Sequence, residues 1–71
     1  MKPDQYRIIA NGEERWIRKP CSVAGFLETC GWKATQVVVE RNGRVLERSE
    51  LGVTQLEADD RLEIIVPVAG G

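Results

Sequence analysis

Two Asn-Gly dipeptides, Asn11-Gly12 and Asn42-Gly43, each lie between two short runs of residues with high strand propensity. Both central residues of a type I′ turn adopt positive φ, and Asn followed by Gly does so at the lowest cost. Such a dipeptide between two runs of this kind is a strong signal for a β-hairpin. The pattern therefore predicts two hairpins, with strands over residues 6–10, 13–17, 36–41 and 44–46.

Between the hairpins, the apolar spacing changes to the three and four that place side chains on one face of a helix. The residues of that face are Val23, Phe26, Leu27 and Cys30. Ser22 is a suitable N-cap, because its hydroxyl can accept from a free backbone N–H of the first turn. Gly31 follows where a left-handed residue commonly ends a helix. Gly25 lies within the predicted helix, and its missing side chain is expected to let the helix lie close to the sheet.

The last predicted strand covers residues 61–68 and is apolar enough to be a central strand of a sheet. Pro67 cannot donate a ladder hydrogen bond, so regular pairing should end near it. Residues 69–71 are expected to form a flexible tail, and residues 1–5 a short extension before the first strand. We interpret residues 1–71 as a single domain.

The inward positions of these elements define a predicted hydrophobic core. Its members are Ile8, Ala10, Ile17, Val23, Phe26, Leu27, Val37, Val39, Val45, Leu56, Leu62, Ile64 and Val66.

The composition narrows the possible functions. The chain has 71 residues and a net charge of −1, with 10 basic and 11 acidic residues, which gives no reason to expect nucleic acid or an anionic membrane as a partner. It contains no histidine, which excludes Ser-His and Cys-His nucleophile arrangements and removes the commonest metal ligand. The sequence has no signal-peptide pattern and no apolar run long enough to span a bilayer, so we expect a cytoplasmic protein. Its small size and its lack of histidine favour a carrier or binding module over an enzyme, and we expect a monomer.

The chain resembles the ThiS family of sulfur carriers, which are ubiquitin-like β-grasp proteins. The segments that carry the resemblance are Asn11-Gly12-Glu13, Val23–Gly31, Val37–Gly43, Arg48–Glu50, Arg61–Ile64 and the final Gly70-Gly71. The resemblance implies an α+β fold: a mixed five-stranded sheet of order 2-1-5-3-4, with the first and last strands parallel and one helix packed across one face. Where the family usually has Gly-Asp before the last strand, this chain has Asp59-Asp60.

The resemblance also implies a reaction at the end of the chain. An E1-like, ThiF-type adenylating enzyme would use ATP and Mg²⁺ to convert the Gly71 carboxylate to an acyl-adenylate, and a sulfur donor such as a cysteine desulfurase would then turn it into a thiocarboxylate. Thiazole synthase would take that sulfur for thiamine biosynthesis. Val68, Ala69 and Gly70 would thread into the partner, since glycine lets backbone walls approach closely. The carrier itself would bind no cofactor and no metal.

Five residues are candidates for a partner-binding surface. Ile9 and Ile65 are expected on the sheet face away from the helix, where exposed apolar side chains can mark an interface. Glu63, Asp59 and Asp60 place acidic side chains near the tail, where they could steer docking onto a basic groove.

Other readings stay open. Cys21 and Cys30 could accept persulfide sulfur, although packing is the simpler account of both, and Trp16 and Trp32 could contact a partner or complete the core. One alternative function is that of the small subunit of molybdopterin synthase, which the last residues of the chain would also suit. A protein modifier joined to lysines through Gly71, and an interaction domain without tail chemistry, are the remaining alternatives.

Overall fold

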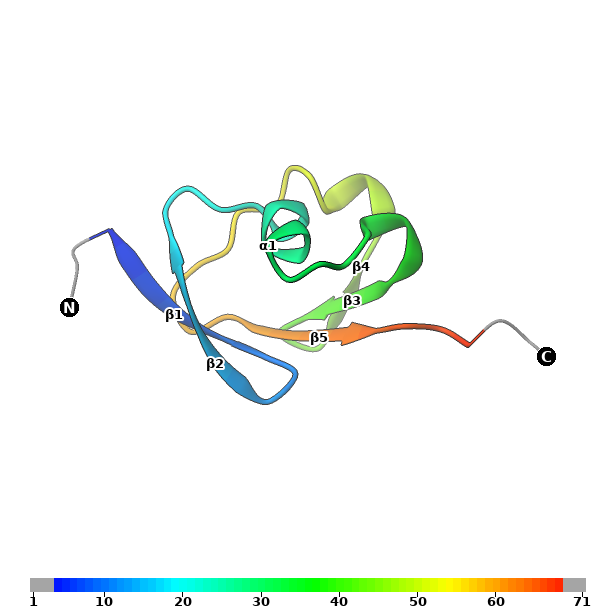
Figure 1. The fold of residues 1–71 in the computed structure, drawn as a ribbon, viewed down its shortest axis with the longest axis horizontal. Helices are drawn as coiled ribbons and strands as arrows, with labels where there is room; N and C mark the ends of the chain where they lie inside the picture. Colours follow the sequence, from blue (N-terminus) through cyan, green and yellow to red (C-terminus); the bar gives the residue numbers. More distant parts are fainter. Residues whose placement is uncertain (1–3, 69–71) are drawn as a thin grey trace.

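Residues 4–68 are described by the computed structural model, in which one α-helix lies across one face of a five-stranded sheet (Figure 1). The strands and the helix are β1 (Gln5–Ala10), β2 (Glu13–Arg18), α1 (Val23–Thr29), β3 (Val38–Arg41), β4 (Arg44–Leu46) and β5 (Arg61–Ile65). Two short 3₁₀ helices, η1 (Ala34–Gln36) and η2 (Arg48–Glu50), flank the second hairpin. None of the helices within residues 4–68 has the length and apolar character needed to cross a bilayer.

The sheet has the strand order β2-β1-β5-β3-β4, with β5 at its centre. Strands β1 and β5 are parallel and pair at Ile9 with Arg61 and at Ala10 with Leu62, whereas β3 is antiparallel to both β4 and β5. The prediction of a β-grasp fold with this strand order is therefore confirmed. Gln5, predicted as part of an extension, belongs to β1.

Both predicted hairpin turns are present. Asn11 and Gly12 have φ values of 51° and 80°, and Asn42 and Gly43 have φ values of 52° and 84°. These are the two consecutive left-handed residues that a type I′ turn requires. The turns are thus determined locally, by the two dipeptides themselves.

The helix begins and ends as its sequence predicts. The Ser22 hydroxyl accepts a hydrogen bond of 3.0 Å from the N–H of Gly25, and Gly31 adopts a φ of 83° beyond the last turn. A Cβ built on Gly25 would lie 3.2 Å from the Ser22 hydroxyl oxygen. Gly25 is therefore adapted to the N-cap and not, as we expected, to close packing against the sheet.

The core lies between α1 and the sheet, and the predicted core is correct except at Val45 and Val66. Three residues that the prediction omitted, Tyr6, Leu46 and Leu51, are also buried. The buried apolar side chains are Tyr6, Ile8, Ala10, Ile17, Val23, Phe26, Leu27, Val37, Val39, Leu46, Leu51, Leu56, Leu62 and Ile64.

Val45 was wrongly assigned because of the register of the second hairpin. Its two-residue turn pairs Val39 with Leu46 and Glu40 with Val45. Directly opposed residues share a face of the sheet, so the inward Val39 makes Leu46 inward and Val45 outward. Val45 is 56% exposed.

Strand β5 is shorter than predicted and ends at Ile65 rather than at residue 68. Its antiparallel partner β3 begins at Val38, opposite Ile65, and the preceding chain is turned into η1. The following residue, Val66, is 51% exposed and is not part of the core. The predicted tail, residues 69–71, lies outside the described part of the chain.

Candidate functional site

Of residues 4–68, the segment that follows β5 is the nearest in sequence to Gly71, the predicted site of the reaction. Residues 66–68 continue beyond the sheet from its central strand (Figure 1). Gln36 of η1 lines an open groove together with Val66, Pro67 and Val68, and Val68 is 91% exposed. The predicted site of modification, Gly71, and the predicted threading residues Gly70 and Ala69 lie outside the described residues.

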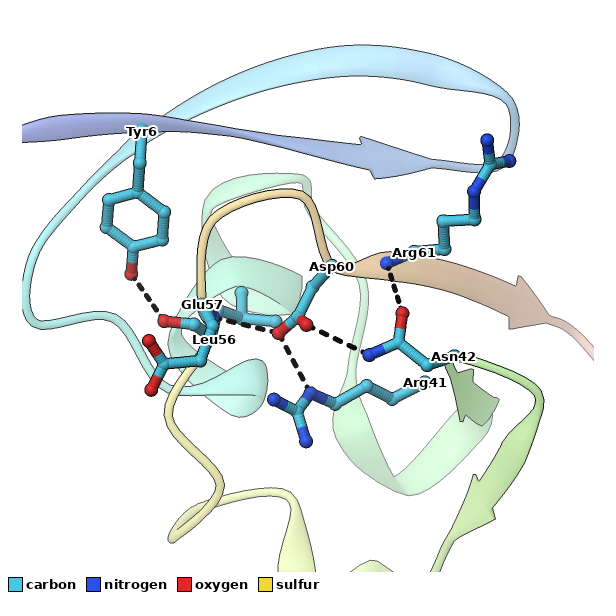
Figure 2. Close-up of polar contacts among 7 residues, drawn as sticks. All are labelled: Tyr6, Arg41, Asn42, Leu56, Glu57, Asp60 and Arg61. Carbon is cyan, nitrogen blue, oxygen red and sulfur yellow. Dashed lines mark hydrogen bonds and ion pairs between the residues drawn. The ribbon is translucent and has the colours of Figure 1, made fainter.

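Both asparagines of the hairpin turns hold β5 through their side chains. On the β3 side, the Asn42 Oδ1 accepts from the Arg61 N–H at 2.9 Å, and its Nδ2 donates to Asp60 Oδ1 at 2.9 Å (Figure 2). On the β1 side, the Asn11 Oδ1 accepts from the Ile64 N–H at 2.7 Å, and its Nδ2 donates to the Ile64 carbonyl at 3.4 Å. The residue that makes each turn therefore also fixes the central strand.

The chain enters β5 through a cluster of hydrogen bonds centred on the Asp60 carboxylate (Figure 2). Asp60 Oδ2 accepts from Arg41 Nε and from the Glu57 N–H, each at 2.8 Å, while Oδ1 accepts from Asn42. Nearby, the Tyr6 hydroxyl donates to the Leu56 carbonyl at 2.8 Å, which explains how this polar side chain is buried. These contacts join the turn before β5 to β1 and β3.

Asp60 is held as a carboxylate. Burial by itself raises the pKa of Asp60, but hydrogen bonds from the Glu57 N–H, Asn42 and Arg41, with the Arg41 charge, outweigh burial and leave the pKa below its usual value. The residue is only 5% exposed. Asp60 therefore does not belong to a partner-binding surface, contrary to our prediction. Its carboxylate is directed inward and is hydrogen-bonded within the fold.

Asp59 occupies the left-handed position where the family pattern has glycine. Its φ is 67°, its N–H donates to the Arg7 carbonyl at 2.7 Å, and its exposed carboxylate forms an ion pair of 2.8 Å with the Arg7 guanidinium. Aspartate tolerates this conformation better than most residues. Asp59 therefore adopts the left-handed turn conformation that the resemblance led us to expect of a glycine.

The face of the sheet opposite α1 is not covered by any element of residues 4–68 (Figure 1). We call it the open face and assign its members from strand alternation and register. Its residues are Gln5, Arg7, Ile9, Glu14, Trp16, Arg18, Val38, Glu40, Val45, Arg61, Glu63 and Ile65.

The open face brings together three of the five predicted partner-surface residues: Ile9, Glu63 and Ile65. Ile65 is 44% exposed and lies directly opposite Val38, while Ile9 is partly buried. Asp59 reaches the margin of this face through its ion pair with Arg7.

Sequence reasoning did not place three apolar side chains on the open face: Val38, Val45 and Trp16. Val45 was assigned to the core, and Trp16 was left between a partner contact and the core. Each is exposed, and Trp16 is opposite Arg7 on β1. The signal was available for Val45, because a two-residue turn at Asn42-Gly43 fixes the register of the hairpin. Trp16 also lines a groove of about 510 Å³ with Trp32, between β2 and α1.

Neither cysteine lies in the kind of exposed, electropositive environment that is typical of a reactive thiol. Both are partly buried against the core cluster. Burial raises the pKa of the Cys21 thiol, with a further contribution from Cys30, although Cys21 lies just before the helix N-terminus. Packing is therefore the account that the structure favours for Cys21. Within residues 4–68, no group of three or more potential Cys, Asp or Glu ligands is arranged to hold a metal ion.

Comparison with known proteins gives one consistent picture. The family model described as "ThiS family" matches residues 3–71. Two curated relatives, each named thiazole synthase, match over 65 residues: that of Magnetococcus marinus is 32% identical and that of Paramagnetospirillum magneticum 31%. The matched part is 92% of this chain but only 20% of either relative, so this chain spans a small part of their length.

Two solved structures of a thiamine biosynthesis protein of Geobacter metallireducens share this fold. The crystal structure, which is of ThiS, has a TM-score of 0.79 and 28% identity, over 92% of this chain and 99% of that one. The solution structure has a TM-score of 0.74 and 28% identity, over 92% of this chain and 87% of that one.

Proposed function

Because this chain belongs to the ThiS family, we propose that it is a sulfur carrier of thiamine biosynthesis and a substrate of partner enzymes rather than an enzyme. The observation that carries the proposal is the family match over residues 3–71. The likeness to the ThiS structure of Geobacter metallireducens supports it independently through the fold. In this proposal, the working end of the carrier is Gly71 and its carboxylate.

The proposed chemistry has two steps at that carboxylate. An α-carboxyl group is ionised near neutral pH, since its ordinary pKa is about 3.3–3.7. In an E1-like adenylating enzyme, a carboxylate oxygen of Gly71 would attack the α-phosphorus of Mg-ATP, and pyrophosphate would leave. Sulfur at the oxidation level of sulfide would then attack the acyl carbon, and AMP would leave to give the thiocarboxylate. A cysteine desulfurase is the proposed origin of the sulfur, which it delivers as a persulfide. A thiol reductant would supply the two electrons that bring this sulfur to the level of sulfide, and the thiol would leave as a disulfide.

Thiazole synthase is the proposed recipient of that sulfur. The two curated relatives that carry a region similar to this chain are themselves named thiazole synthase. The names of the matched proteins favour this recipient over molybdopterin synthase, which the last residues of the sequence had left open. The alternative of a protein modifier is tested separately, by looking for conjugates of high mass on a denaturing gel.

The described residues suit a carrier whose end is presented to another protein. The central strand β5 is held from both sides, and the exposed residues Val66 and Val68 follow it. The open face continues from the same strand and carries Ile65, Val38 and Val45 as exposed apolar side chains. We propose that the adenylating enzyme contacts this face while it holds the tail.

The test is the intact mass of the chain after incubation with the cognate adenylating enzyme, Mg-ATP and a sulfide source. The expected result is a gain equal to one sulfur in place of one oxygen, located at Gly71 by fragmentation. A chain lacking Gly71 and a reaction without ATP are the controls, and neither should gain this mass. The proposal fails if the full chain shows no ATP-dependent gain while the same enzyme converts an established carrier.

A further inference from the structure

The side-chain amide of Asn11 extends the parallel ladder between β1 and β5. Regular pairing of these strands ends at Ala10 with Leu62, and the chain then turns back at Asn11-Gly12. The Asn11 N–H still donates to the Leu62 carbonyl at 2.9 Å. Its side chain then bonds both the N–H of Ile64, at 2.7 Å, and the carbonyl of Ile64, at 3.4 Å.

The support on the two sides of β5 differs beyond Leu62. On the β3 side, backbone pairing continues through Ile64 and Ile65. On the β1 side, the Asn11 amide supplies the contacts that reach Ile64, because β1 itself has ended. Asn11 therefore completes the two-sided support of β5 immediately before the exposed residues 66–68.

We propose that Asn11 is a positioning residue that fixes the direction in which the C-terminal segment leaves the sheet. This inference rests on the proposed function, because its consequence is how readily a partner captures the tail. A segment that leaves the fold in a fixed direction loses less conformational freedom on entering a narrow site than one that swings. The Asn11 amide acts on that entry through Ile64 and does not touch the reacting atoms.

The chain offers a closely matched control at Asn42. Both asparagines occupy the first central position of a type I′ turn, with φ values of 51° and 52°, and each is followed by glycine. Each accepts one backbone N–H and donates one hydrogen bond through its side chain. The Asn42 bonds lie at the start of β5, at Asp60 and Arg61. Substitution to glycine keeps both turns and removes one pair of bonds in each case.

The first readout needs no partner enzyme. Nitrogen-15 relaxation of the full chain is measured at Val66 and Val68 in the wild type, Asn11→Gly and Asn42→Gly. We expect lower order parameters at both valines in Asn11→Gly only. Thermal unfolding of each variant shows that the measurements are made on folded protein. Equal order parameters at Val66 and Val68 in the two folded variants would overturn the inference.

The second readout is the kinetics of adenylation, followed by pyrophosphate release with the cognate enzyme. We expect Asn11→Gly to raise the KM for the carrier about fivefold and to leave kcat within about twofold, because the lost order must be restored on binding. Asn42→Gly should keep both constants within about twofold. A KM of Asn11→Gly equal to that of Asn42→Gly would contradict the positioning role.

The two proposals fail in different ways. If the wild type is not adenylated, the proposed function is refuted, and the relaxation data still decide whether Asn11 restrains Val66 and Val68. If the wild type is adenylated but the two variants behave alike, only the role of Asn11 is refuted.

Discussion

Glu40 of β3 and Glu63 of β5 lie directly opposite each other on the open face. Like charges in this arrangement destabilise a sheet, by an amount on the order of 0.2–1 kcal/mol. The ion pairs found among residues 4–68 include neither glutamate. An acidic pair beside Val38 and Ile65 suits a partner that supplies a cationic side chain at the margin of an apolar contact.

Neutralising Glu63 should therefore have opposite effects on the stability of the fold and on binding to the partner enzyme. We expect Glu63→Gln to raise the free energy of unfolding by up to about 1 kcal/mol, because it removes the repulsion from Glu40. The same change should raise the KM of the adenylating enzyme for the carrier several-fold. Urea unfolding and pyrophosphate release measure the two effects.

Glu28→Gln is the control for this change of charge, since Glu28 is exposed on α1, on the other side of the sheet. It should leave the KM unchanged. An equal rise in KM for both variants would show that net charge, and not the open face, governs the association.

Replacing Asp59 should show what its left-handed conformation costs. Glycine adopts a φ of 67° without steric penalty, so Asp59→Gly should stabilise the fold by about 0.5 kcal/mol despite the lost ion pair with Arg7. Exposed ion pairs of this kind contribute little. Asp59→Asn removes the charge but keeps a side chain that tolerates the conformation, and its stability should stay close to that of the wild type. A loss of stability in Asp59→Gly, measured by urea unfolding, would show that the ion pair outweighs the backbone strain.

The stability of the fold should depend on the ionisation of Asp60. Its pKa in the folded chain is lower than the ordinary value of about 3.9, so the folded state favours the carboxylate. This contribution is complete well above the ordinary pKa and is lost as the pH falls through the lowered pKa. We expect the free energy of unfolding to decrease below about pH 5.

Asp60→Asn tests this assignment. At pH 7 it should destabilise the fold by about 1–3 kcal/mol, because an amide cannot accept from all the donors that meet the carboxylate. Its stability should also vary less with pH in the acid range. Some variation should remain, since the pKa of Glu50 is lowered as well, chiefly by the Glu47 N–H. An unchanged acid dependence would place the responsible carboxylate elsewhere.

Cys21 should be a slow nucleophile in the folded chain. Burial raises the pKa of its thiol, which reduces the fraction present as the reactive thiolate. Iodoacetamide at pH 7.5 should modify Cys21 at least about tenfold more slowly in the native chain than in urea. Mass spectrometry of timed samples measures both rates. Rapid modification of the native chain would reopen a role for Cys21 in sulfur handling.

Local residue types were enough to predict the features that depend on neighbouring residues. Asn11-Gly12 and Asn42-Gly43 specify their turns because those residues adopt positive φ readily. Ser22 and Gly31 delimit α1 for similarly local reasons. The alternation of Leu62 and Ile64 marked the inward face of β5, and the family resemblance supplied the order of the strands.

Features that depend on residues distant in the sequence could be assigned only from the folded sheet. Asp60 became buried because Arg41, Asn42 and the Glu57 N–H converge on its carboxylate, and a pattern of adjacent acidic residues does not reveal such partners. Val66 continues the apolar alternation of β5 but is exposed, since β3 begins only opposite Ile65. The Asn11 side chain can hydrogen-bond to the backbone of Ile64 only because β5 lies beside β1. Local conformation is encoded by local residue types, whereas burial and side-chain partners are set by which strands meet.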